Sequence, residues 1–244
     1  MNSPSPLVLA AKRGISAVRE NLAPALVLQL LLGVLVGSYF LWPSSAVLLY
    51  KLSAWKQAGG MWFSMAATGF AGGFLAELSK VCFGQRGRCT RANVEDALFN
   101  FVMLGLSGGI VHLFYEQQAR WFGDHLAWSV ILSKTAVDML FFTPIWATPF
   151  QTIFWLWKNN RYSWAVVHRE LYDAYFTRHY LPLLFMQWAF WIPVVMMTYS
   201  LPLVLQFPFF LVAMATWGLL LGALTKSSVK KETGSPQASP IPAE

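Results

Sequence analysis

Two charged residues, Lys134 and Asp138, stand within the stretch 127–157, which is otherwise almost entirely apolar and aromatic. The stretch is longer than the roughly 20 residues that a helix needs to cross a bilayer. Because residues four apart share one face of a helix, the spacing predicts an ion pair between the two side chains. Pro144 lacks a backbone N–H and should free a carbonyl close to this pair.

Two interpretations of the predicted pair follow from the cost of a charge inside a bilayer, which is ~2.5–3.5 kcal/mol or more for one side chain. The pair is either a structural lock between helices or part of a pore or gate. The second interpretation rests on a general tendency, since ionisable residues within membranes usually face a bundle interior or a watery cavity.

A second group of candidates, His112, Tyr115 and Glu116, lies at the end of the preceding apolar run. His112 and Glu116 are four apart, a spacing that suits a proton relay or two metal ligands. Because two ligands do not make a metal site, we predict none, and a hydrogen-bonded histidine between helices is the simpler interpretation. The sequence lacks H-E-x-x-H, a P-loop and a nucleophile elbow. We therefore expect neither an enzyme nor a bound cofactor.

The composition predicts the elements that must position these side chains. The chain is 56% hydrophobic and 12% charged, whereas soluble domains carry about 25% charged residues. Apolar runs without strand-like alternation predict an all-α, polytopic transmembrane helical bundle. A polar basic N-terminus (1–21) precedes a single transmembrane domain (22–225) and a tail (226–244) that we expect to be disordered. The six predicted spans are 22–42, 59–79, 97–116, 127–157, 179–199 and 202–225.

Lysines and arginines alternate between the segments that connect these predicted spans. With six spans, fourteen of them fall on one side of the membrane and three on the other. Such an excess marks the cytosolic side, where we expect both termini. This distribution, rather than binding to nucleic acid, accounts for the net charge of +7. Pro182 and Pro193 leave an alternative in which 179–199 is a half-length helix and only five spans cross.

Glycines and aromatic residues predict two further features. Glycines four apart mark close contacts between membrane helices, and four such pairs occur in four predicted spans: Gly33/Gly37, Gly69/Gly73, Gly105/Gly109 and Gly218/Gly222. Segment 158–178 combines aromatic side chains with mixed charge, which predicts an amphipathic helix on the membrane surface. Cys82 and Cys89 have no histidine-rich partner and should be free thiols.

Three groups of residues resemble the motifs of a known family. The stretch 108–115, GGIVHLFY, is similar to the G-P-x-x-H-x-W-Y motif of the Mpv-seventeen and twenty-two-kilodalton peroxisomal membrane protein family. The stretch 134–144 reproduces the spacing of that family's K-x-x-x-D-Q-x-x-x-x-P motif. The two prolines that bound 182–193 stand eleven apart, as in the family's last motif. The resemblance covers roughly residues 50–226, and the motifs follow in the family's order.

Several positions depart from the family's motifs. Gly109 replaces the proline of the first motif, and Met139 replaces the Gln of the second. Phe185 and Trp188 occupy the positions of Gln and Asn in the last motif. We therefore expect the polar content of that motif to be lost, whereas the Lys, the Asp and the His are kept.

The resemblance implies a small integral membrane protein with channel-like passage of small solutes. We expect a weakly selective channel or facilitator whose gate is formed by Lys134, Asp138 and His112. The alternative is a non-transporting bundle that organises partners or lipids. The expected partners are the lipid bilayer and a small-molecule solute; a homo-oligomer is compatible with the sequence, and no nucleic acid is expected.

The membrane of residence is predicted from the N-terminus. Family members occupy mitochondrial inner, peroxisomal and related membranes and have bacterial relatives. The N-terminus carries both Arg19 and Glu20 and few serines, unlike a transit peptide. This composition favours a bacterial inner membrane, with the mitochondrial inner membrane as the alternative.

Overall fold

Helices make up most of the protein in the computed structural model, which describes residues 6–42, 44, 47–85, 87–173 and 175–217. No strand occurs among these residues, so the all-α prediction is confirmed for them. The elements, with π-helices labelled η, are α1 (Pro6–Leu41), α2 (Val47–Gly69), η2 (Phe70–Leu75), α3 (Ala76–Ser79), η3 (Lys80–Gly84), α4 (Arg91–Phe122), α5 (Trp128–Val137), η4 (Asp138–Ala147), α6 (Thr148–Asn159), α7 (Trp164–Asp173), η5 (Phe176–Tyr180), α8 (Leu181–Tyr199) and a last helix, Leu203–Trp217.

Three helices of the described chain are long and apolar enough to cross a membrane: Arg91–Phe122, Trp128–Asn159 and Phe176–Tyr199. They correspond to three of the six predicted spans, and the third is not the half-length helix that its prolines allowed. The other three predicted spans do not correspond to a described helix that is both long and apolar enough to cross a membrane. The apolar helices Ala25–Leu41 and Leu203–Trp217 are shorter, and the helix that contains 59–79 bends at Gly60, where φ is 54°. The coarser prediction, a helical membrane protein, therefore stands, without confirmation of six spans.

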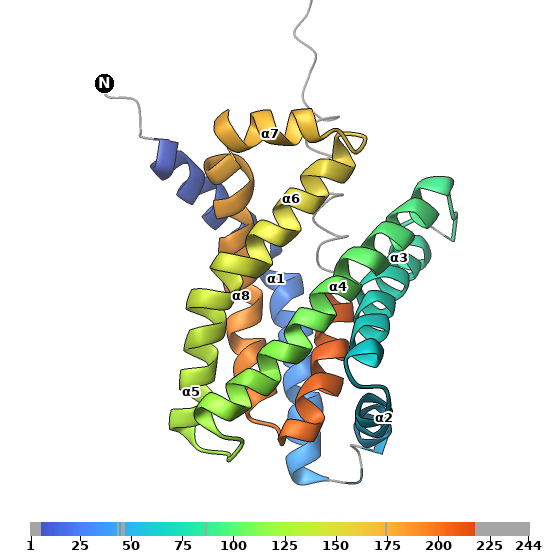
Figure 1. The fold of residues 1–244 in the computed structure, drawn as a ribbon, viewed down its shortest axis with the longest axis vertical. Helices are drawn as coiled ribbons and strands as arrows, with labels where there is room; N and C mark the ends of the chain where they lie inside the picture. The colour runs from blue at the N-terminus through green and yellow to red at the C-terminus, as the bar shows by residue number, and fades with distance from the viewer. Residues whose placement is uncertain (1–5, 43, 45–46, 86, 174, 218–244) are drawn as a thin grey trace, which may run out of the picture.

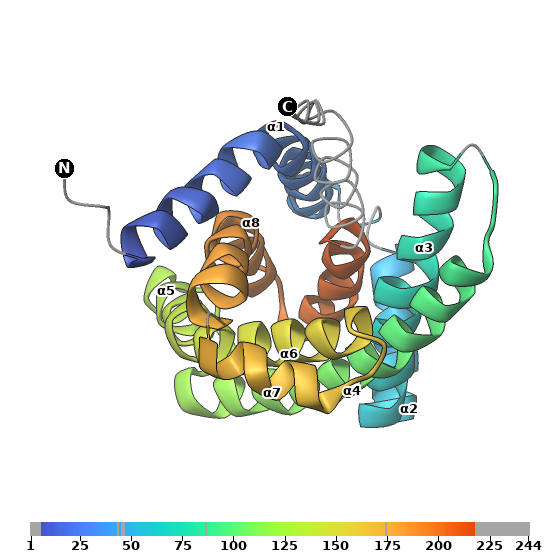
Figure 2. The same cartoon turned by 90° about the horizontal axis from the view of Figure 1, so that it is seen from above.

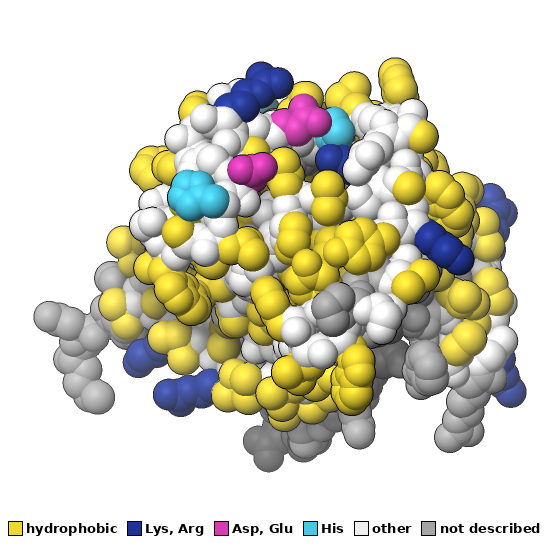
Figure 3. All heavy atoms as spheres, turned by 90° about the horizontal axis from the view of Figure 1, so that it is seen from below, with side chains coloured by type: hydrophobic (Ala, Val, Ile, Leu, Met, Phe, Trp, Pro, Cys, Tyr) yellow, Lys and Arg dark blue, Asp and Glu magenta, His cyan; other side chains and the backbone are white. Residues whose placement is uncertain are grey.

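The basic segments gather at one end of the bundle. In Figure 1 the start of α1, the connection between η3 and α4, and α7 lie towards the upper end, whereas the α1–α2 and α4–α5 connections lie at the lower end. Figure 3, which views the lower end, shows mainly apolar side chains with a few charged ones between them. This arrangement agrees with the alternation of lysines and arginines along the sequence.

The last helix, Leu203–Trp217, lies between α8 on one side and α2 and α3 on the other when the bundle is seen from above (Figure 2). Its side chains form much of the core: Leu205, Phe209 and Ala213 are fully buried. They belong to the same apolar cluster as Val194 of α8. The short last helix is therefore packed inside the bundle, and it forms one wall of the site described below.

Glycines allow the helix formed by α2 and η2 to pack closely against α4. A Cβ atom on Gly73 would stand 2.7 Å from the backbone nitrogen of Phe101, and one on Gly105 would stand 3.1 Å from the carbonyl oxygen of Met65. A side chain at Gly73 would therefore require a shift of the backbone, and one at Gly105 would require its neighbour to give way by a few tenths of an ångström. The same interface contains Gly69 and Gly109.

The glycines of α1 behave differently from those of α2, η2 and α4. A Cβ atom on Gly37 would have no described atom within 4 Å, and one on Gly33 would approach only the flexible end of Met197. Within the described residues, Gly37 therefore makes no close helix contact of the predicted kind. Gly218 and Gly222 lie outside the described residues.

The helix Trp128–Asn159 widens into a π-helix over η4, around Pro144. In a π-helix each N–H donates to the carbonyl five residues earlier, and the N–H of Thr148 donates to Thr143 in this way. A proline ring clashes with the carbonyl four residues before it, which disfavours the ordinary α-helical pattern at Pro144 and Pro149. The two prolines are five apart, so their missing donors fit the same widened pattern.

Two aromatic side chains from the neighbouring helix donate hydrogen bonds to the carbonyl oxygens that these prolines leave without a backbone donor. Five residues before Pro144 stands Met139, whose carbonyl oxygen accepts from Trp188 Nε1 at 2.7 Å. Five residues before Pro149 stands Pro144 itself, whose carbonyl oxygen accepts from the Tyr180 hydroxyl at 2.8 Å. Every buried backbone carbonyl that lacks a partner is costly, so these two bonds tie η4 to η5 and α8.

Candidate functional site

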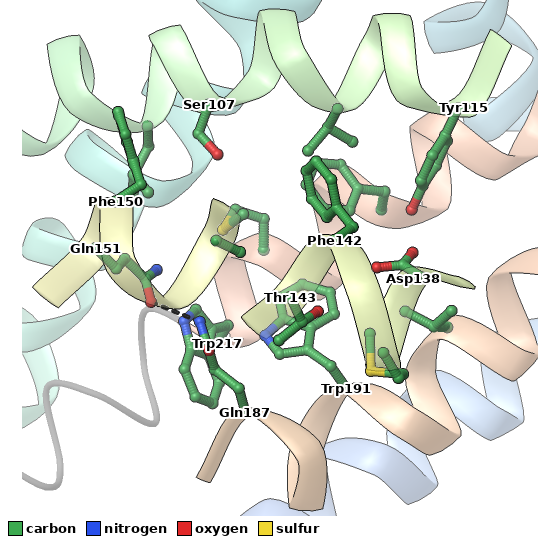
Figure 4. A pocket seen from close by; sticks show the side chains of 17 residues that line it. Ser107, Tyr115, Asp138, Phe142, Thr143, Phe150, Gln151, Gln187, Trp191 and Trp217 are labelled. Carbon is green, nitrogen blue, oxygen red and sulfur yellow. Dashed lines mark hydrogen bonds between the residues drawn. The ribbon is translucent and has the colours of Figure 1, made fainter. Parts of the chain in front are cut away.

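A cavity of about 70 Å³ lies where α4, η4, α6, α8 and the last helix meet (Figure 4). It has room for a few water molecules and is much smaller than the ~300–1,000 Å³ typical of pockets for drug-sized ligands. Among its described lining residues, Asp138 is the only charged one. Aromatic rings line much of the wall: Tyr115, Phe142, Phe150, Trp191, Phe210 and Trp217. Polar lining residues are Ser107, Thr143, Gln151 and Gln187.

Asp138 is buried at one end of this cavity and is held by a chain of two hydrogen bonds. The hydroxyl of Tyr199 donates to Asp138 Oδ2 at 2.9 Å. The oxygen of that hydroxyl accepts from Gln118 Nε2 at 2.8 Å. No ion pair within 4.0 Å joins Asp138 to a basic side chain of the described residues. The carboxylate therefore has a polar neighbour but no positive partner.

The predicted ion pair between Lys134 and Asp138 is wrong. Lys134 is 2% exposed, and its Nζ lies 5.6 Å from the ring centroid of Tyr199. The electron-rich face of an aromatic ring attracts a cation, so Tyr199 contacts the ammonium through its ring and the carboxylate through its hydroxyl. Lys134 is not among the residues that line the cavity.

His112 does not join Lys134 and Asp138 in one layer, as the predicted gate requires. Its Nδ1 lies 3.1 Å from the Ser64 hydroxyl oxygen on α2, and its Nε2 lies 3.2 Å from Glu116 Oε1. The cavity is lined instead by Tyr115, one turn further along α4. Of the predicted site residues, Asp138 and Tyr115 line the cavity, Glu116 lines the groove described next, and His112 lines neither.

A groove of about 400 Å³ lies next to the cavity, between α4 and η4. Its polar lining residues are Glu116, Gln117 and Arg120. Phe142 lines both this groove and the cavity. Its ring stacks on Phe114 with a centroid separation of 4.2 Å. The side chain of Phe142 therefore stands between the two spaces.

A second groove, of about 510 Å³, lies between α6 and the helix formed by η5 and α8. Its polar lining residues are Thr152, Asn159, Asn160, Arg178 and His179. Two amides separate it from the cavity, because Gln187 Nε2 donates to Gln151 Oε1 at 2.9 Å. The hydroxyl of Thr148 donates to Gln187 Oε1. The first groove therefore meets the helix Trp128–Asn159 at Phe142, within the stretch that lines the cavity, and the second groove meets it directly after Gln151.

A cluster of charges ties α3, α4 and α6 together near the upper end of the bundle. Lys80 Nζ donates to Asp96 at 3.0 Å and to Glu77 at 3.1 Å, and Lys158 also pairs with Asp96. Asn93 donates to the other oxygen of Glu77 at 3.0 Å. Burial alone would lower the pKa of Lys80, but hydrogen bonds and charge from Asp96 and Glu77 raise it above its ordinary value. Because this cluster lies outside the cavity, we interpret it as a structural contact that holds these helices together.

The sequence interpretation missed Tyr199, Gln118, Gln151 and Gln187. A signal was present, since each is a polar residue within or beside an apolar run, and such residues are costly in lipid unless they are hydrogen-bonded. Phe185 and Trp188 take the Gln and Asn positions of the last motif, but a variable position of that motif is polar. Gln187 stands next to Trp188 and supplies an amide to the cavity wall.

No group of three or more His, Cys, Asp or Glu side chains in the described part of the chain could hold a metal ion. Comparison with protein-family models, with curated proteins and with solved structures found no match for the chain. The function must therefore be argued from the geometry alone.

Proposed function

We propose that the protein is an integral membrane facilitator that lets small polar solutes pass along the line of groove, cavity and groove. The observation that carries the proposal is the buried Asp138 in a cavity that also contains four uncharged polar side chains, between helices long enough to cross a membrane. Ionisable residues at such depth are costly and mark solute or ion pathways in membrane proteins.

Two narrow points divide the proposed path. At the first point, the Phe142 ring stands between the cavity and the groove of α4 and η4, which we call the lower groove. At the second point, the hydrogen-bonded amides of Gln151 and Gln187 stand between the cavity and the groove of α6, η5 and α8, which we call the upper groove. Passage requires both to move, and the volume of about 70 Å³ limits the solute to a few non-hydrogen atoms. Among the described residues that line this path, the charged groups stand in the grooves and at Asp138, which favours polar solutes over apolar ones.

The test is solute flux into liposomes that contain the purified protein. After a hyperosmotic shock with urea, glycerol or sorbitol, light scattering follows the recovery of liposome volume as solute enters. We expect faster recovery with urea and glycerol than in protein-free liposomes, and no such difference with sorbitol, which is too large for the cavity. Equal rates with and without protein for all three solutes would contradict the proposal.

A matched pair of variants on α4 locates the path. Ser107 lines the cavity, whereas its neighbour Leu106 is 46% exposed on the outer face. Ser107→Phe should fill the cavity and abolish the added flux, and Leu106→Phe should leave it unchanged. If both variants conduct like the parent, solutes do not use this cavity.

A second candidate function is a bundle that transports nothing and organises partners or lipids. The stacked rings of Phe114 and Phe142 favour it, because they close the lower side of the cavity. The same liposome experiment separates the two functions. Residence in a bacterial or mitochondrial inner membrane, assembly into a homo-oligomer and membership of the resembling family stay predictions.

A further inference from the structure

We infer that the cavity binds a small ammonium-type cation between the Asp138 carboxylate and the aromatic wall. This inference deepens the proposed function by naming the class of solute. It rests on that function for the passage of the solute, whereas binding in the cavity can be measured on its own.

The first argument is charge. Asp138 is 5% exposed, and the only hydrogen bond to its carboxylate from the described residues comes from the neutral Tyr199 hydroxyl. The nearest basic candidate on its own helix, Lys134, is held over the Tyr199 ring and does not line the cavity. A buried carboxylate without a positive partner is strongly unfavourable. A cation in the cavity supplies the missing partner.

The second argument is the wall. Rings of five elements line the cavity, including Phe142 of η4, Trp191 of α8 and Phe210 of the last helix. Figure 4 shows such rings along the length of the space, with Asp138 and Tyr115 at one end and Gln151, Gln187 and Trp217 at the other. Aromatic faces attract cations, and aromatic cages are a recurrent way to bind ammonium groups. A neutral solute gains nothing from this property.

The third argument is the indole N–H of Trp217, a hydrogen-bond donor without an acceptor in the described chain. Trp217 is 1% exposed, it lines the cavity, and its Nε1 has no hydrogen-bond partner among the described residues. A buried N–H without a partner is costly. It therefore calls for water, or for an acceptor atom on the solute, in the same space as the cation. The cavity is thus built for a hydrated or hydroxylated ammonium ion rather than for an apolar molecule.

The test uses the full chain in detergent and methylammonium chloride as the probe. Methanol, with the same number of non-hydrogen atoms and no charge, is the matched neutral compound, and sodium chloride controls for ionic strength. We expect methylammonium, but neither control, to raise the temperature of thermal unfolding in a saturable way. Isothermal titration should then give a dissociation constant.

Asp138→Asn should weaken the binding of methylammonium by about tenfold or more, because the charge partner is lost. Glu95→Gln is the matched control, since Glu95 is an exposed carboxylate paired with Arg91 outside the cavity. Trp191→Leu provides a second measurement in case Asp138→Asn does not fold, and it should also weaken binding. No binding by the parent, or equal binding by the parent and these two cavity variants, would overturn the inference.

Binding and flux are measured separately, so the two proposals can fail separately. If methylammonium binds but no solute flux occurs in liposomes, the proposed facilitator function is contradicted and the proposed cation site is retained. Flux of urea and glycerol without binding of methylammonium would overturn the cation site and leave the facilitator.

Discussion

The indole N–H of Trp188 donates to the carbonyl oxygen of Met139 at 2.7 Å, the backbone group that Pro144 leaves without a donor in the π-helix. The side chain of one helix thereby completes the backbone of another. Asp138 begins that π-helix, so the bond from α8 also fixes the segment that carries the carboxylate of the cavity.

Trp188→Phe should lower the free energy of unfolding by about 1–3 kcal/mol, because the Met139 carbonyl loses its donor. Trp62→Phe is the control, since Trp62 is 73% exposed on α2. Pro144→Ala restores a backbone N–H in the same helix, so the cost of Trp188→Phe should shrink in that background. Chemical denaturation in detergent measures the stabilities of the parent, the three single variants and the double variant. Equal costs in both backgrounds would show that Trp188 does not act on the backbone that Pro144 interrupts.

The ring of Tyr199 should determine how much Lys134 contributes to stability. A cation over an aromatic ring contributes about 0.5–2 kcal/mol. Tyr199→Phe keeps the ring, so Lys134→Met should cost the same in that background as in the parent. Tyr199→Leu removes the ring, and Lys134→Met should then cost less. Thermal unfolding of the single and double variants measures these differences; an unchanged cost in all three backgrounds would rule out the ring contact.

Phe142→Ala should increase solute flux several-fold, because its side chain separates the lower groove from the cavity. Phe141→Ala is the matched control, since Phe141 is the adjacent residue and is 58% exposed on the outside. Stopped-flow light scattering with glycerol measures both. An increase in both variants would indicate a leak from general loosening rather than an opened path.

Gly73→Ala should destabilise the protein by about 1–3 kcal/mol, because the new methyl group meets the backbone of Phe101. Gly37→Ala should be neutral or stabilising by about 0.4–1 kcal/mol, since the helix there has open space and alanine restricts the unfolded chain. Thermal unfolding in detergent compares the two. If both substitutions cost the same, the contact between η2 and α4 is looser than described.

The two ends of the bundle should face opposite sides of the membrane. Cys82 of η3 and Cys89 of the η3–α4 connection are exposed free thiols. That connection lies towards the upper end (Figure 1), so both thiols should react with a membrane-impermeant maleimide from one side only. In a variant without both cysteines, Ser163→Cys in the α6–α7 connection should react from that same side. His125→Cys in the α4–α5 connection should react from the other. Labelling of all three positions from one side would contradict this orientation.

Local composition was enough to predict the helical membrane character and the position of three long apolar helices. Hydropathy summed over about twenty residues is a property of the segment alone, and Arg91–Phe122, Trp128–Asn159 and Phe176–Tyr199 carry it within their own sequence. The presence of a charged residue at depth was equally visible. The sequence thereby singled out Asp138, which the structure places in the wall of the cavity.

The tertiary structure decided which groups meet. Spacing on a helix allows Lys134 to reach Asp138 but does not choose its rotamer, and the ring of Tyr199, from a distant helix, offers the ammonium another partner. Gly37 and Gly73 stand in the same four-residue pattern, yet only Gly73 has a backbone opposite it. Contacts between helices depend on which elements lie face to face. That arrangement is a property of the whole packed bundle and is absent from any single segment.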